Sequence, residues 1–252
     1  MNDNGLRGKV FLVTGSGRGL GAALARAAGA EKARVVVNCR SDTASAEAVA
    51  AEVRRAGGEA RAVRADVAEF AGARDLVDET LAKWGRIDVL VNTVGSFHWN
   101  PLVEVEPPEW RRVVASNLDS VFHMCRLVVP HMRERRFGRI VNFAAVGAAA
   151  TLGEPQMAAY TAAKAGVVAL SRALALEEAR CGITVNVVSP GLLRDESAGK
   201  ASADADERLG ERVPVGHAGR AVDVVRAVLF FASPAADFVT GQVVEVAGGS
   251  RL

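Results

Sequence analysis

The chain has 252 residues, half of them hydrophobic, and its 31 lysines and arginines nearly balance 29 acidic residues, giving a net charge of +2. This balance gives no electrostatic case for a nucleic-acid partner, and a single tyrosine among few aromatic residues argues against a base-stacking surface. No apolar run reaches the length of a membrane span, and the N-terminal MNDNGLRGK lacks the apolar core of a signal peptide, so we expect a soluble, cytoplasmic protein with no membrane partner.

A glycine-rich turn follows the first predicted strand. The apolar run Val10–Val13 leads into TGSGRGLG, and a helical pattern then continues to about Lys32. In a strand–turn–helix of this kind, glycines allow a tight turn, close approach of a pyrophosphate and close helix packing, and the helix N-terminus attracts phosphates. The pattern predicts a dinucleotide-binding turn made of Gly15, Ser16, Gly17, Arg18, Gly19, Leu20 and Gly21.

The end of the second predicted strand, residues 34–38, bears on the choice between NAD and NADP. A carboxylate there would pair with the ribose hydroxyls of NAD, but this chain has Asn38, followed by Arg40 and Ser41. Arginine suits a phosphate better than a diol, and Arg18 lies in the glycine turn, so the sequence favours NADP. Arg40 as an ordinary solvated arginine is the alternative.

Strand and helix patterns alternate along the rest of the chain. Helices are predicted over 43–57, 69–84, 107–136, 156–179 and 221–232, and further strands over 60–64, 88–92, 139–143, 183–188 and 241–246. Such alternation implies right-handed βαβ units. We therefore predict one α/β domain over residues 1–252, a Rossmann fold with a doubly wound seven-stranded parallel sheet, helices on both faces, and ligands at the carboxyl ends of the strands.

Several polar residues after these strands have two interpretations each. Asp66, before Val67, could accept from an adenine amino group or cap the next helix. Asn117, in mid-helix, is either held by backbone carbonyls or holds a water near the candidate centre described next. His98 and Trp99, in a proline-rich loop, line a substrate pocket or simply pack the loop. The polar stretch 194–212 predicts either a mobile lid or a disordered loop.

Tyr160 and Lys164 form the candidate centre. On a helix, a spacing of four residues places both side chains on one face, one turn apart. A lysine ammonium beside a phenol favours the phenolate, so the pair predicts a tyrosine usable as an acid or base at neutral pH. No serine occurs between Ser120 and Ser171, and the three cysteines are too scattered to suggest a disulfide or metal site.

These motifs resemble those of the classical short-chain dehydrogenases/reductases from end to end. TGSGRGLG is similar to TGxxxGxG, residues 66–67 to the family's Asp–Val, VNTVG (91–95) to VNNAG, Tyr160 and Lys164 to YxxxK, and SPG (189–191) to the nicotinamide-side PG. The C-terminal VPVGHAGRAVDVVRAVLFFASPAADFVTGQVVEVAGG resembles the β-ketoacyl carrier-protein reductase subgroup, as does VVVNCRS, which looks like its NADP-preferring turn.

The resemblance implies roles for individual residues. Tyr160 would protonate a carbonyl oxygen as hydride arrives, Lys164 would lower the pKa of Tyr160 and hold the nicotinamide ribose, and Asn117 would position a water. Further cofactor contacts would come from Asp66, Val67, Asn92, Gly95, Pro190, Gly191 and Leu193. The resemblance also implies a homotetramer in which the helices of Asn117 and Tyr160 pair across an interface.

One departure from the family pattern concerns the serine that orients the substrate carbonyl. Alignment on the strand places Ala145 there, and alignment back from Tyr160 places Gly147; neither has a hydroxyl, and Thr151 could substitute only if its loop folds inward. One hypothesis is an NADP(H)-dependent reductase of a small-molecule ketone, such as a β-ketoacyl (carrier-protein- or CoA-bound) or polyketide-like compound. The other rests on Ala145 and Asp195: a chain that keeps NADP(H) but performs dehydration, isomerisation or cyclisation, or only binds.

Overall fold

The computed structural model describes residues 4–194 and 210–250 and contains one seven-stranded sheet with the order β3-β2-β1-β4-β5-β6-β7. Every neighbouring pair of strands is parallel. The strands are β1 (Val10–Val13), β2 (Arg34–Cys39), β3 (Glu59–Arg64), β4 (Val89–Asn92), β5 (Gly138–Phe143), β6 (Ile183–Pro190) and β7 (Val243–Val246). The predicted fold class is confirmed.

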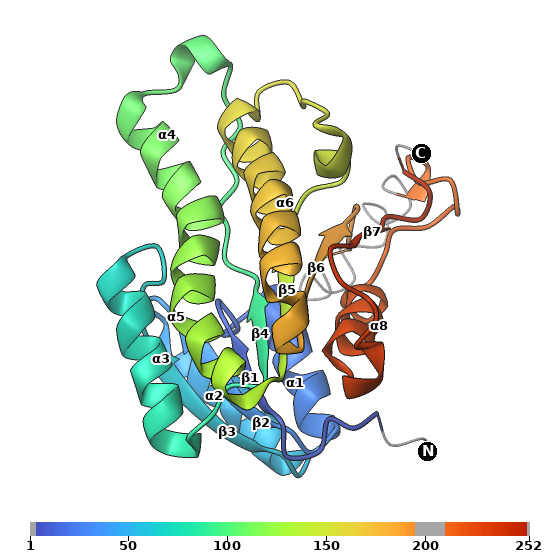
Figure 1. The fold of residues 1–252 in the computed structure, drawn as a ribbon. Coiled ribbons are helices and arrows are strands. Elements are labelled where there is room, and N and C mark those ends of the chain that lie inside the picture. Colours follow the sequence, from blue (N-terminus) through green and yellow to red (C-terminus); the bar gives the residue numbers. More distant parts are fainter. Residues whose placement is uncertain (1–3, 195–209, 251–252) are drawn as a thin grey trace.

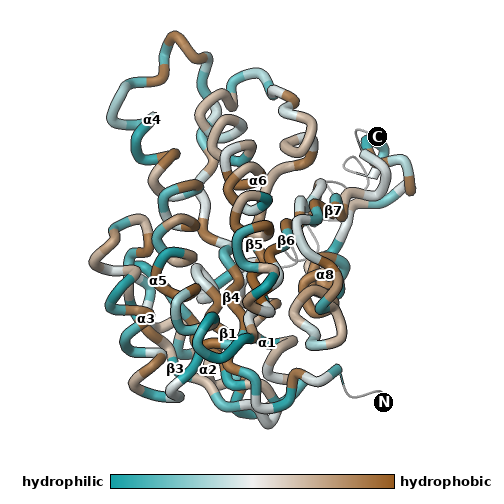
Figure 2. The backbone as a smooth tube through the Cα atoms, viewed as in Figure 1, coloured by the Kyte–Doolittle hydropathy of each residue, from teal (hydrophilic) through white to brown (hydrophobic). Residues whose placement is uncertain are grey.

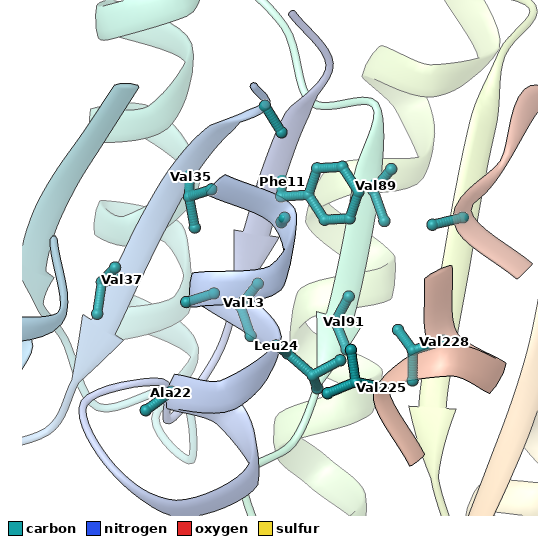
Figure 3. Packing of buried hydrophobic residues seen from close by; sticks show 14 of the residues in the cluster. Phe11, Val13, Ala22, Leu24, Val35, Val37, Val89, Val91, Val225 and Val228 are labelled. Carbon is teal, nitrogen blue, oxygen red and sulfur yellow. The ribbon is translucent and has the colours of Figure 1, made fainter. Parts of the chain in front are cut away.

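The central strands β1 (VFLV) and β4 (VLVN) are apolar runs because both faces of the sheet are covered there, whereas the edge strand β3 (EARAVR) carries charged residues. Successive side chains point to opposite faces, so Phe11 and Val13 join one buried cluster and Leu12 joins the other. Figure 3 shows the first cluster, with Phe11 and Val89 between the strands and helices α1 and α8. Hydrophobic residues accordingly concentrate on the inner strands in Figure 2.

The helices divide between the two faces as a doubly wound fold requires. Buried side chains of α1 (Gly19–Ala30), α2 (Thr43–Arg55) and α8 (Ala221–Ala232) belong to the first cluster. Those of α3 (Phe70–Trp84) and α5 (Ser120–Arg135), with Val167 and Ala175 of α6 (Ala158–Glu178), belong to the second. In Figure 1, α5 and α6 stand in front of the sheet and α8 lies on its other side. No helix within residues 4–194 and 210–250 is long and apolar enough to cross a membrane.

The predicted helix over 107–136 is continuous but not uniform. It comprises α4 (Pro107–Val114), a π-helical segment, Ala115–Asp119, and α5. The sequence did not predict the π segment, which widens the helix around Asn117. Helix α6 starts at Ala158, because Gln156 has a φ of +64°, and β7 starts at Val243, because Gly241 has a φ of +72°.

The order of the strands reverses between β1 and β4, since the chain proceeds outward to β3 on one side and to β7 on the other. In open α/β sheets, ligands bind at such a point, outside the carboxyl ends of the strands. The segments that follow β1, β2, β4 and β5 therefore define the place to look for a site. The predicted lid over 194–212 lies almost wholly outside the described residues, as does Asp195.

Candidate active site

The glycine turn has the geometry that its sequence predicts. Gly15 has a φ of +60°, which allows the chain to turn sharply after β1. A Cβ on Gly21 would lie 2.8 Å from the carbonyl oxygen of Gly15, so only glycine permits this approach of α1. A Cβ on Gly19 would meet nothing within 4 Å, which leaves space beside the N-terminus of α1. The first amides of that helix lack partners within the helix and so suit a phosphate.

Asn38 fixes this turn to the neighbouring strands. Its side-chain oxygen accepts from the Gly15 amide at 3.0 Å, and its Nδ2 donates to the carbonyl oxygen of Ala65 at 3.0 Å. Ser16 also turns inward, because its hydroxyl donates to the carbonyl oxygen of Val13 and its amide donates to that of Asn38. The polar groups of Ser16 thus bind β1 and β2, and its contact with a cofactor stays a prediction.

A cleft of about 600 Å³ opens over the carboxyl ends of the strands. This volume lies within the usual range for small-molecule and cofactor sites. Most of the predicted cofactor residues line it, namely Gly15, Gly17, Arg18, Gly19, Leu20, Gly21, Arg40, Ser41, Asp66, Val67 and Gly95. Asp66 Oδ1 also accepts from the Ala68 amide at 3.0 Å, so this carboxylate caps its own turn while it lines the cleft.

Besides Ser16, Tyr160 and Lys164, four predicted cofactor residues are not part of this lining. Asn92 lies beneath it, where its Nδ2 donates to Asn142 Oδ1 at 2.8 Å, so the prediction of a direct cofactor contact is not supported for its side-chain amide. Pro190 and Gly191 follow at the carboxyl end of β6, and the Gly191 amide donates to Val246. Leu193 bridges to Gly219 and packs on the first core cluster.

Asn117 and Lys164 both lie next to Gly95, which lines the cleft. A Cβ on Gly95 would lie 2.4 Å from Asn117 Oδ1 and 3.3 Å from Lys164 Nζ. The Asn117 Nδ2 donates to the carbonyl oxygens of Ser96 and Val113 at 2.9 and 3.0 Å. Its Oδ1 is buried with no partner among the described residues, so this atom is free to accept one more hydrogen bond.

Tyr160 lies in the first turn of α6, on the same face as Lys164, as predicted. Lys164 Nζ donates to the carbonyl oxygen of Phe143 at 2.9 Å and lies 5.6 Å from the centroid of the tyrosine ring. Burial raises the pKa of Tyr160 to about 12 and lowers the pKa of Lys164 to about 8. The predicted lowering of the tyrosine pKa is therefore wrong, because desolvation of the phenol raises this pKa. The phenol remains protonated.

The wall beside Tyr160 contains Ala145. Tyr160 forms a buried cluster with Val113, Met157 and Ala159, and Ala145 packs against it. Gly147 differs: its φ is +80°, and a Cβ there would lie 3.1 Å from the side chain of Leu152. Of the two candidate positions for the missing serine, Ala145 contacts the cluster around Tyr160.

The loop after β5 is held by a hydrogen bond to a residue of β7. The amide of Gly147 donates to Glu245 Oε1 at 2.7 Å, across 98 residues of sequence. Thr151 is exposed and its hydroxyl donates to the carbonyl oxygen of Ala150, so it does not fold inward to replace a serine. Sequence reasoning missed Glu245, since nothing near either residue signals the contact.

The loop after β4 brings a different residue to the centre from those predicted. His98 Nδ1 pairs with Glu109 Oε1 at 2.7 Å, and Trp99 is largely exposed; neither lines the cleft. Phe97 does line it, and its ring lies against Tyr160 with a centroid separation of 4.6 Å. The sequence signal that could have identified Phe97 is a large apolar side chain two residues after the glycine of VNTVG.

The fold and the site together define a Rossmann-type dinucleotide-binding protein with a tyrosine–lysine centre. A family profile described as enoyl-(acyl carrier protein) reductase matches residues 15–251. The 3-oxoacyl-[acyl-carrier-protein] reductase of Staphylococcus epidermidis is 36% identical over 97% of this chain and 99% of its own. The 3beta-hydroxysteroid dehydrogenase 1 of Eggerthella lenta is 39% identical over 98% of this chain and 95% of its own.

Solved structures agree with these relatives. A protein from Agrobacterium tumefaciens assigned as a gluconate dehydrogenase superposes with a TM-score of 0.90 at 32% identity, over 99% of this chain and 98% of its own. One from Sinorhizobium meliloti assigned as a short-chain alcohol dehydrogenase gives a TM-score of 0.89 at 29% identity, over 98% and 97% of the chains. The chain belongs to the short-chain dehydrogenase/reductase family of oxidoreductases, which use a nicotinamide cofactor.

Proposed function

We propose that the protein is an NADPH-dependent carbonyl reductase in which Tyr160 donates the proton. The observation that carries this proposal is that Asn117 and Lys164 both lie next to Gly95 of the cleft, with Lys164 one helical turn from Tyr160. An acid and a cation placed where a nicotinamide would end are the groups that carbonyl reduction needs.

The residues of the cleft fit a dinucleotide with a 2′-phosphate. Gly19 leaves space at the N-terminus of α1, and Arg18, Arg40 and Ser41 line the region after β2. The only carboxylate of that turn, Asp42, accepts from the amide and the hydroxyl of Ser45 and so caps α2. These features support NADPH over NADH.

Substitution of Arg40 tests the cofactor. Arg40→Ala should weaken NADPH binding about tenfold, as expected for loss of a charge-assisted hydrogen bond, and should leave NADH binding unchanged. Titration of each dinucleotide against the intrinsic tryptophan fluorescence gives both dissociation constants. Equal weakening of the two dinucleotides would contradict recognition of the phosphate by Arg40.

The chain's own groups would handle the proton. The bound nicotinamide supplies a hydride. Tyr160, kept protonated by burial, donates its hydroxyl proton to the carbonyl oxygen as the alkoxide develops. Lys164 then gives a proton to the tyrosinate, and a water held by Asn117 Oδ1, which is free to accept, returns a proton from solvent to Lys164.

The named relatives support a carbonyl group as the reacting centre. One is named for 3-oxoacyl thioesters on acyl-carrier protein and another for a hydroxysteroid, so a ketone is common to both. A carrier-protein- or CoA-bound acyl chain is therefore one substrate to test. Non-redox chemistry is the second candidate, favoured only by Ala145 beside Tyr160, because this wall lacks a second hydroxyl for the carbonyl.

Loss of NADPH absorbance with a panel of ketones decides between the candidates. The panel should contain a β-ketoacyl thioester, cyclic ketones, quinones and, because of the matched family profile, an enoyl thioester. Tyr160→Phe should abolish turnover and leave NADPH binding intact. Tight NADPH binding without turnover of any compound would contradict the proposed reduction and favour the non-redox candidate.

We also propose a homotetramer. Phe122 on α5 and Leu176 on α6 are large apolar side chains that are 47% and 84% exposed, and Phe238, near β7, is fully exposed. Burial of such residues between subunits would account for their exposure in one chain. Light scattering after size exclusion would give the mass, and Leu176→Glu should reduce it if α6 lies in an interface.

A further inference from the structure

An exposed ring covers the tyrosine. The rings of Phe97 and Tyr160 are separated by 4.6 Å between centroids and tilted by 33°, a close offset arrangement. Tyr160 is only 7% exposed, whereas Phe97 is 63% exposed. Phe97 thus shields the Tyr160 ring from solvent, although few contacts hold the Phe97 side chain itself in place. Another flat group could displace this ring or extend the stack.

Phe97 also lies where a substrate must approach. It lines the cofactor cleft together with Gly95 and Ser96, and it contacts Tyr160, which is outside that lining. A carbonyl that receives hydride from the cleft and a proton from Tyr160 must lie between the two. The body attached to that carbonyl therefore meets the ring of Phe97.

The side chains packed around Tyr160 are apolar. Tyr160 clusters with the buried Val113, Met157 and Ala159, and the partly buried Ala145 packs against this cluster. None of the four has a side-chain donor. Beside them a second carbonyl, such as that of a thioester, would find no donor, whereas an apolar ring would gain contact with Phe97 and Ala145.

We propose that Phe97 is a specificity-determining residue, which selects ketones borne on a flat apolar ring over flexible acyl thioesters by stacking such a ring beside Tyr160. This inference rests on the proposed ketone reduction. Under it, the missing serine hydroxyl and the exposed aromatic belong to one site that holds its substrate by shape and apolar contact.

Kinetics of two variants test the selection. Phe97→Ala should lower kcat/KM about tenfold for 2-tetralone, a cyclic ketone fused to a flat benzene ring, as expected for loss of an aromatic stack. For the N-acetylcysteamine thioester of acetoacetate, the same substitution should change kcat/KM less than about twofold. Trp99→Ala is the matched control, since Trp99 lies in the same loop and is 61% exposed, close to Phe97. It should change neither value. Equal losses for both substrates in Phe97→Ala, or no loss, would overturn the proposal.

A measurement without turnover separates this inference from the proposed function. Tyr160 is the only tyrosine, so ring-labelled tyrosine gives one NMR signal from the site. Phe97→Ala should remove the ring-current shift of that signal, and Trp99→Ala should retain it. In the NADP⁺-bound protein, 2-tetralone should move the signal, with a dissociation constant raised about tenfold by Phe97→Ala. Such binding without reduction would refute the reductase and support the stack; an unaltered signal in Phe97→Ala would refute the stack.

Discussion

A serine placed at Ala145 should speed carbonyl reduction. Ala145 packs on the cluster that contains Tyr160, so a hydroxyl added there would lie on the wall that faces the reacting carbonyl. The backbone of Ala145 is not among the positive-φ residues, so serine needs no strained conformation at this position. The substitution adds one oxygen and alters no charge.

The size of the expected rate increase follows from the stabilisation that a hydroxyl gives to a developing oxyanion. A preorganised donor to a developing oxyanion contributes ~3–4 kcal/mol, so full alignment would raise kcat by about two to three powers of ten. The gain should be smaller than this limit, because a serine hydroxyl here must orient itself without a partner on the apolar wall. An increase of at least about tenfold is the expected result.

Gly147→Ser is the matched control. Gly147 has a φ of +80°, and its added Cβ would lie 3.1 Å from Leu152, so serine there is strained by ~1–2 kcal/mol and faces another group. The assay is single-turnover loss of NADPH absorbance at saturating ketone, with dinucleotide binding and thermal unfolding measured in parallel. An unchanged rate for a folded, NADPH-binding Ala145→Ser protein would refute the placement of the carbonyl beside this residue. A faster Gly147→Ser protein would show that Gly147 is the position facing the carbonyl.

Three further outcomes follow from the site. Burial lowers the pKa of Lys164 to about 8, so the charged lysine destabilises the folded chain below pH 8, and this cost disappears as the pH rises towards 10.5. Lys164→Met should therefore raise the free energy of unfolding by ~2–3 kcal/mol at pH 7 and leave it unchanged near pH 10.5. Chemical denaturation at both pH values measures this difference. Burial raises the pKa of Tyr160 to about 12, so phenolate absorbance should be absent at pH 10.5 while circular dichroism shows a folded chain, and Phe97→Ala should shift its appearance to lower pH. Glu245→Ala should slow turnover and lower the melting temperature, because the Gly147 amide loses its hydrogen-bond acceptor. Glu245→Gln keeps a side-chain oxygen as acceptor and should restore most of the turnover rate and of the melting temperature. Equal losses in the two variants would show that the charge of Glu245, and not the hydrogen bond, is responsible.

The layered fold was predictable because its signals are local. Apolar runs such as Val10–Val13 are long enough for strands and too short for helices, and the helical patterns between them impose parallel neighbours. The glycine turn was predictable for the same reason, since Gly15 and Gly21 satisfy steric demands within a few residues. The π segment around Asn117 was not, because a widened turn depends on tertiary contacts, here that of the asparagine amide with the carbonyl oxygen of Ser96.

The site was predictable where one helix sets its geometry and not where loops meet. Tyr160 and Lys164 share a face of α6, which their spacing predicts. The stack of Phe97 on Tyr160 joins two segments 63 residues apart, as their numbering shows, and no periodic pattern marks it. The pKa of Tyr160 was mispredicted for this reason: the neighbouring lysine is visible in the sequence, whereas the burial that dominates is not.

The two halves of the site explain each other. The cleft side offers polar groups, with Asn117 and Lys164 next to Gly95, and the opposite wall beside Tyr160 is apolar. Ala145 is partly buried, so a serine hydroxyl there would lose part of its water without gaining a partner until a carbonyl arrived, at a cost of ~1 kcal/mol in the free protein. Ala145 avoids this cost and keeps the wall continuous with the ring of Phe97. Ala145→Ser should therefore be less stable as well as faster, and a variant that gained rate at no cost in stability would show that the hydroxyl already has a partner on this wall.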